Sequence, residues 1–141
     1  AGRDAAGAIL EKYSSTTYGP LAALVSARMH FQSGDLKTAR AQLQWVTDNA
    51  KTEELKSVAR LRLANVLVDD SAADEALKVL SAKPAPGFEG LFEALRGDIL
   101  LTQKKIPEAR SAYKAAAEKA GRSSGGLDQT LRRKIEALGE S

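Results

Sequence analysis

A helical pattern that returns three times constrains this chain more than any other feature of its sequence. Three segments each carry a small residue and then an alanine twelve residues later: Ala27 and Ala39, Ala64 and Ala76, Gly97 and Ala109. The small residues stand 37 and 33 residues apart, and so do the alanines. Small residues let two helices approach closely, because a larger side chain would hold the helices apart. The pattern therefore predicts three successive pairs of packed helices.

A period near 34 residues with small residues at these points is typical of tetratricopeptide repeats. We expect an all-α superhelix of about eight helices, forming a single domain over residues 1–141. The expected parts are an N-terminal helix over Arg3–Tyr13, repeats at about 20–51, 53–82 and 88–120, and a C-terminal capping helix at 127–138. Repeat arrays of this kind generally bind other proteins along their concave face.

Local signals indicate where several helices begin and end. Asp35 and Thr52 are expected N-caps, because their side-chain oxygens can accept hydrogen bonds from the first backbone N–H groups of a helix. Gly34 is expected in the left-handed conformation between two helices. Ser71 resembles the first residue of a capping box before a short helix that starts at Ala72. These signals divide each repeat into two helices.

The composition fits small helices that pack tightly. Hydrophobic residues make up 43% of the chain but aromatic residues only 5%, so alanine and leucine supply most of the apolar surface. Residues 53–68 are apolar on most faces, so we expect this helix to be buried all round. No apolar run reaches the length of about 18 residues that a membrane-spanning helix needs. Because the chain begins with Ala1, we expect it to be an excised or processed part of a longer protein.

The residue types argue against catalysis and against nucleic-acid binding. The chain has no cysteine, and its one histidine, His30, stands mid-helix, where we expect a partly buried packing role. No zinc site, phosphate-binding loop or nucleophile motif is present, so we expect no enzyme activity, cofactor or metal. The net charge of +3 comes from 21 basic and 18 acidic residues that are interleaved, which does not favour nucleic acid as a partner.

Two rows of equivalent positions are the candidate binding residues. The polar row follows each small residue directly, and the apolar row lies one turn further along: Arg28, Asn65 and Asp98, then Phe31, Val68 and Leu101. The first helix of each repeat lines the concave face of such an array. A polar row beside an apolar row suits an amphipathic or extended peptide. Alternatively, the apolar row only packs between adjacent helices.

Two runs carry a more specific resemblance than the repeat itself. They are Leu43-Gln44-Trp45-Val46, which continues into the segment 59–64, and Arg96-Gly97-Asp98-Ile99-Leu100, which is followed by 108–113. With the ending at 131–138, these runs resemble the YfgM family. The resemblance covers nearly the whole chain. This chain departs from the family in one respect, because it is net basic where the family has an acidic bias.

The resemblance implies a fold and a function. Members of the family are bacterial inner-membrane proteins with one transmembrane helix and a tetratricopeptide-like domain on the periplasmic side. They are described as ancillary subunits of the Sec translocon, associated with a membrane-anchored periplasmic chaperone of the prolyl-isomerase type and linked to envelope stress signalling. The implied partners are Sec translocon subunits, that chaperone and secretory chains. The membrane would be reached only through an N-terminal anchor absent from this chain.

One alternative function stays open at this stage. The chain is then a general tetratricopeptide scaffold in another cell-envelope assembly complex, without a link to the translocon. Under either interpretation we expect a non-enzymatic protein-binding domain that is monomeric in isolation. The family supplies no catalytic motif to transfer to this sequence.

Overall fold

The computed structural model describes residues 19–120 and 127–139, and within these ranges the chain forms seven helices and no strand. The helices are α2 (Gly19–Gln32), α3 (Leu36–Asn49), α4 (Glu53–Asp69), α5 (Ala73–Val79), α6 (Glu89–Thr102), α7 (Ile106–Ala120) and α8 (Leu127–Ala137). The expected all-α class is confirmed. The expected N-terminal helix over Arg3–Tyr13 lies outside the described residues, so seven helices stand against the eight predicted.

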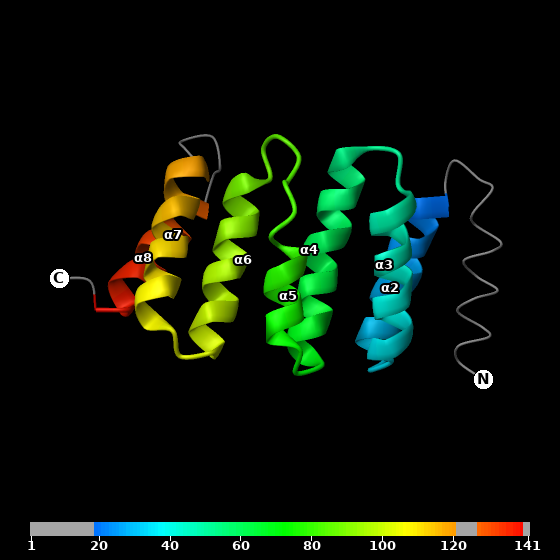
Figure 1. Cartoon of the computed structure of the whole chain (residues 1–141), viewed down its shortest axis with the longest axis horizontal. Helices are drawn as coiled ribbons and strands as arrows, with labels where there is room; N and C mark the ends of the chain where they lie inside the picture. The colour runs from blue at the N-terminus through cyan, green and yellow to red at the C-terminus, as the bar shows by residue number, and fades with distance from the viewer. Residues whose placement is uncertain (1–18, 121–126, 140–141) are drawn as a thin grey trace. The chain divides into compact units, whose positions relative to one another are not determined.

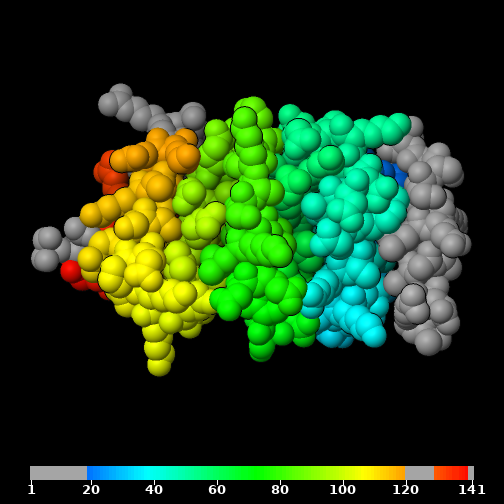
Figure 2. Space-filling model, viewed as in Figure 1, coloured from blue at the N-terminus to red at the C-terminus, as the bar shows by residue number. Residues whose placement is uncertain are grey.

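The helices form two compact units that divide between Val79 and Leu80. In the first unit, α2 packs on α3, α3 on α4, and α4 on α5 (Figure 1). In the second unit, α6 packs on α7 and α7 on α8. The space-filling view in Figure 2 shows the side chains of α3 and α4 meeting along one face of the first unit. Each unit therefore consists of helices that pack on their sequence neighbours.

The small residues of the repeat lie where paired helices come together. The five alanines of the pattern are 0–1% exposed, and Gly97 is also buried. A fully exposed helix face would leave such residues in solvent, so their burial identifies them as the contact points between helices. The sequence-based expectation for these positions is confirmed.

Three turns of the same design end the first helix of each repeat. Gly34, Ser71 and Lys104 all have positive φ, at 88°, 59° and 61°. The residue after each one closes the turn by donating its backbone N–H to a carbonyl five residues back, as Asp35 does to His30 at 2.8 Å. This is the six-to-one bond of a Schellman motif, and it satisfies carbonyl groups at the helix end. Gly34 therefore adopts the conformation expected for it.

Ser71 does not begin a capping box, contrary to expectation. Its backbone is left-handed, and its N–H bonds to the Val68 carbonyl at 3.0 Å, so Ser71 terminates α4 instead of starting α5. The helix that follows ends at Val79, before the expected end of the second repeat at residue 82. The turn geometry shared with Gly34 takes precedence over the capping signal in the local sequence.

The two other expected caps are present. Asp35 accepts a hydrogen bond from the Thr38 backbone N–H at 3.2 Å, and Thr52 accepts one from the Leu55 N–H at 3.2 Å. The hydrogen bonds from the Thr38 side chain and backbone hold the pKa of the Asp35 carboxyl below its ordinary value. Both side chains satisfy backbone donors that the helix itself leaves without partners.

Helix α4 is not buried all round, contrary to the expectation from its apolar composition. One side is buried, as at Leu63 and Leu67, each 2% exposed, while Arg62 and Asn65 are exposed and Val68 is half-buried. Arg62, Asn65 and Asp69 are exposed polar residues that fall on one stripe of the helix. That stripe opens onto the surface described in the next section.

The capping helix packs on the second unit through its apolar stripe. Leu131 is fully buried against Tyr113 and Ala116 of α7, and Ile135 and Leu138 lie partly buried beside them. Arg132, Arg133 and Glu136 of α8 stay exposed. An amphipathic helix of this kind closes the apolar end of a repeat array.

Candidate functional site

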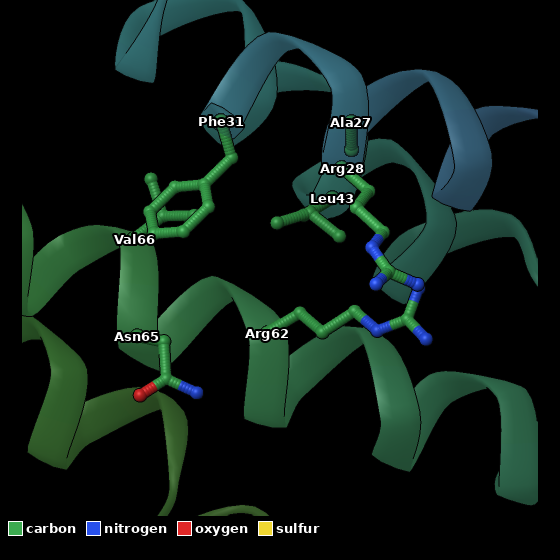
Figure 3. Close-up of a pocket in the computed structure, with 7 residues that line it drawn as sticks. All are labelled: Ala27, Arg28, Phe31, Leu43, Arg62, Asn65 and Val66. Atoms are coloured by element: carbon green, nitrogen blue, oxygen red, sulfur yellow. The ribbon is translucent and has the colours of Figure 1, made fainter. Parts of the chain in front are cut away.

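A pocket of about 220 Å³ opens between the first helices of two successive repeats. Three of its residues come from α2, one from α3 and three from α4: Ala27, Arg28 and Phe31, then Leu43, then Arg62, Asn65 and Val66 (Figure 3). All of them belong to the first unit. The pocket is therefore built by one continuous part of the chain.

The floor of the pocket is apolar and closely packed. Ala27, Leu43 and Val66 are each only 1–2% exposed, so the side chains that form this floor have little room to rearrange. Phe31 is half-buried, and Figure 3 shows its ring beside the Val66 side chain. Preformed apolar surfaces of this kind need little ordering when a ligand binds.

Two arginines stand at the rim of the pocket. Arg28 and Arg62 are both exposed, and Figure 3 shows their guanidinium groups on the same side of the pocket, away from Phe31. Neither arginine forms an ion pair or hydrogen bond with any residue in the described part of the chain. Two cations near one another repel, so the pocket carries a positive potential that an anion would relieve.

A second hollow in the same unit differs because its arginine is paired with acidic residues. It is lined by side chains of α3, α4 and α5, among them Arg40 and Glu75. There the arginine is already neutralised, because Arg40 pairs with Glu75 and also with Asp70 at 3.6 Å. The charge of this second hollow is therefore satisfied within the chain, and it makes the weaker candidate site.

Asn65 presents one amide N–H and its amide oxygen to its surroundings. Its amide nitrogen donates to the backbone carbonyl of Leu61 at 3.2 Å, one turn earlier in α4. Its amide oxygen accepts no hydrogen bond from the described residues. An amide oxygen in this position suits a backbone N–H donor of a bound chain.

The structure brings together three of the six predicted binding residues, because Arg28, Phe31 and Asn65 line the pocket. Val68 is half-buried one turn beyond Asn65 and does not line it. Asp98 and Leu101 lie on α6 in the second unit, where Leu101 is 37% exposed.

Asp98 makes contacts within the second unit that the sequence pattern did not suggest. Its carboxylate accepts a hydrogen bond from the Tyr113 hydroxyl at 2.6 Å and pairs with the Lys134 ammonium at 2.7 Å. Lys134 also lies over the Tyr113 ring, 5.4 Å from its centroid. Burial, together with the hydrogen bond to Asp98 and its negative charge, raises the pKa of the Tyr113 hydroxyl. Asp98 thus links three helices of its own unit.

Sequence reasoning missed four of the seven lining residues, among them Arg62 and Val66. Arg62 precedes Asn65 by three positions, so the two share a helix face, and this spacing was the signal that could have found it. Val66 follows Asn65 directly and belongs to the edge between the buried and exposed sides of α4. The repeat comparison overlooked Arg62 because its equivalents in the other repeats, Val25 and Leu95, are apolar.

His30 lies beside the pocket residues on α2 but faces the interior. Its Nδ1 donates to the Ser26 carbonyl at 2.9 Å and lies 3.2 Å from the amide oxygen of Gln42 on α3. The Gln42 amide nitrogen in turn donates to the Ser26 hydroxyl at 2.8 Å. This network joins α2 to α3 and agrees with the packing role expected for the histidine.

Two further observations concern residues 19–120 and 127–139 only. No group of His, Cys, Asp and Glu side chains in them could hold a metal ion. None of their helices combines the length and the apolar character that crossing a bilayer requires.

Comparison with known proteins places this geometry in a family. A family model described as a tetratricopeptide repeat-like domain matches residues 1–140. The ancillary SecYEG translocon subunit of Escherichia coli strain K12 is 38% identical over 111 residues, covering 77% of this chain and 54% of that protein. The protein of the same name from Neisseria gonorrhoeae is 29% identical over 128 residues, covering 91% and 61%.

A third relative of the same name, from Buchnera aphidicola subsp. Schizaphis graminum, is 27% identical over 97 residues, covering 69% of this chain and 50% of that protein. The resemblance to the YfgM family is thereby confirmed. The chain spans about half the length of the curated relatives it matches. No solved structure matches it.

Proposed function

Since the chain belongs to the tetratricopeptide repeat-like domain family, we propose that it is the protein-binding domain of an ancillary subunit of the Sec translocon. The observation that carries the proposal is the 38% identity to the Escherichia coli ancillary SecYEG translocon subunit. The longer protein would be anchored in the bacterial inner membrane, with this domain on the periplasmic side. Its partners would be translocon subunits, a periplasmic prolyl-isomerase-type chaperone or emerging secretory chains.

The mechanism is non-covalent binding by a preformed surface. The pocket lined by residues of α2, α3 and α4, here called the α2–α4 pocket, offers an apolar wall at Phe31 and polar groups at Arg28 and Asn65. A segment of a partner protein could contact these groups. A rigid helical surface loses little conformational entropy on binding, so moderate affinity needs only a modest contact area. The domain acts as a monomer without cofactor and without catalysis.

Site-specific photocrosslinking in intact cells tests this proposal. A photoreactive residue is placed at Phe31 or at Asn65 in the full-length protein. Adducts with translocon subunits, the chaperone or secretory chains are the expected result. Probes at Ala41 and Asp48, exposed positions on α3 that do not line the pocket, serve as controls.

Two results would count against the proposal. If only the control probes give adducts, the α2–α4 pocket is not the binding surface. If the pocket probes give adducts only with unrelated envelope assemblies, the general scaffold function replaces the translocon function.

A further inference from the structure

We infer that the α2–α4 pocket binds an extended peptide segment in which an Asp or Glu side chain neighbours an apolar side chain. The inference rests on the proposed protein-binding function and specifies which sequences the pocket selects. It follows from three features of the pocket: its two arginines, its apolar wall and the side-chain amide of Asn65. Each feature restricts the ligand in a different way.

The arginines select a carboxylate. Arg28 and Arg62 line one pocket from two different helices, and no acidic group of the described residues pairs with either. A guanidinium group donates two parallel hydrogen bonds to a carboxylate, which gives both strength and geometric selectivity. A carboxylate held between them would also relieve their mutual repulsion. Arg40, in contrast, already has acidic partners within the chain.

The apolar wall selects a neighbouring hydrophobic side chain. Phe31 and Val66 face the pocket on the side away from the guanidinium groups, and Leu43 lies between the two sides (Figure 3). The cavity volume of about 220 Å³ is smaller than the range of about 300–1,000 Å³ that is usual for small-molecule sites. It therefore suits single side chains of a peptide better than a cofactor.

Asn65 selects an internal segment over a chain terminus. One N–H of its amide group donates to the Leu61 carbonyl, so the second N–H and the amide oxygen remain for a ligand. One donor and one acceptor on the same amide match the carbonyl and the N–H of a peptide backbone, which continues on both sides of the contact. We therefore assign the carboxylate that the arginines bind to a side chain within the segment.

Fluorescence anisotropy with defined peptides and the 141-residue chain tests the inference. The first peptide carries Asp and Glu beside Leu and Phe, with its C-terminus amidated. The second replaces the acids by Asn and Gln, and the third does the same but has a free C-terminal carboxylate. We expect the first peptide to bind, with an affinity that falls as salt is added. The second and third should bind roughly tenfold more weakly or worse.

Variants of the chain locate the effect. Arg28→Gln and Arg62→Gln each remove one pocket charge and should weaken the first peptide by roughly tenfold. Lys51→Gln removes one charge from an exposed loop residue that does not line the pocket, and it should leave the affinity unchanged. Circular dichroism of each variant establishes that its helices are intact.

Three outcomes would overturn the inference: equal binding of the first two peptides, tighter binding of the third peptide than of the first, or an equal loss in Lys51→Gln. The failure of the inference can be told from the failure of the proposed function. If the peptides do not bind but the probe at Phe31 crosslinks to translocon partners, the function stands and the ligand chemistry assigned here is wrong. If the first peptide binds selectively but no such adducts form, the ligand chemistry stands and the proposed function fails.

Discussion

Gly97 in α6 faces the ring of Tyr113 in α7 so closely that a Cβ added to the glycine would lie 2.5 Å from the ring carbon Cε1. Real Cβ atoms essentially never approach another atom that closely, so either the ring or the helix would have to move. The ring is fully buried, and its hydroxyl is held by Asp98, so it has little freedom to give way. Glycine at this repeat position is therefore a packing requirement.

We expect Gly97→Ala to destabilise the protein. Overpacking of a well-filled core costs about 1–3 kcal/mol, while replacing glycine by alanine in a helix returns about 0.5–1 kcal/mol. The net loss should reach up to about 2 kcal/mol in urea unfolding. Combining the change with Tyr113→Leu removes the ring, so the cost of Gly97→Ala should largely disappear in that background. If Gly97→Ala alone made the protein more stable, the contact with the Tyr113 ring would not require glycine at this position.

Replacing Ser71 or Lys104 by glycine should make the protein more stable. Each has a left-handed backbone, with φ of 59° and 61°, at the position that Gly34 fills in the first repeat. A side chain in this region is strained, and relief of that strain outweighs the greater freedom of glycine in the unfolded chain. Strain of about 1–2 kcal/mol less an entropy cost of about 0.4–1 kcal/mol leaves a gain of about 0.5–1 kcal/mol for each, measured as a higher midpoint of urea unfolding.

The reverse change at Gly34 is the matched control. A Cβ at this glycine would meet nothing within 4 Å, so steric contact with neighbouring residues plays no part. Its φ of 88° is nevertheless unfavourable for alanine, so Gly34→Ala should lose stability. If all three variants changed stability in the same direction, backbone strain would not be the cause.

Stability should fall at high pH because of Tyr113. Burial first, and then the hydrogen bond and negative charge of Asp98, raise the pKa of this hydroxyl above its ordinary value of 10.0. Below pH 10 the tyrosine is neutral in both states and its contribution is fully present. Above pH 10 the unfolded chain releases the proton while the folded chain retains it, so unfolding becomes more favourable.

Urea unfolding between about pH 9 and 11 measures this dependence. Tyr113→Phe lacks the ionisable hydroxyl and should lose less stability over the same range, although it keeps Lys134. Equal slopes for the two proteins would place the pH dependence elsewhere in the chain.

Asp98→Ala should affect folding more than partner binding at the α2–α4 pocket. The variant removes the acceptor of the Tyr113 hydroxyl, which costs about 0.5–1.5 kcal/mol. Its ion pair with Lys134 is more than a third exposed on both sides and should add little. Thermal unfolding of Asp98→Ala, Tyr113→Phe and the double variant should give non-additive losses, because both single changes remove the same bond. Additive losses would mean that the bond contributes nothing.

Local sequence signals were sufficient where the structure is governed by nearest neighbours along the chain. The caps at Asp35 and Thr52 and the left-handed turn at Gly34 each depend on residues within one helical turn. The repeat period was equally informative, because the small residues at Ala27, Ala64 and Gly97 occupy the same contact in every helix pair. Ser71 shows where local reasoning fails, since its capping pattern yields to the turn that the repeat imposes.

The candidate site was only half accessible to the same reasoning. Equivalence between repeats selected Arg28, Phe31 and Asn65, which line the pocket, and their role in binding stays a prediction. It could not indicate Arg62, because that position has no polar equivalent in the other repeats. It also could not show that Asp98 is held by Tyr113, because that bond depends on how α6 packs against α7.

The sequence by itself determined the helical class, the repeat period, most of the helix ends and the small residues at the helix contacts. These properties follow from the backbone preferences of neighbouring residues and from side-chain size, and both can be read directly from the sequence. Only the tertiary structure decided that Arg28 and Arg62 share a pocket while Arg40 and Asp98 are neutralised by other groups. Whether these four charged side chains are paired depends on the packing of residues far apart in the chain, so a local sequence pattern cannot predict it.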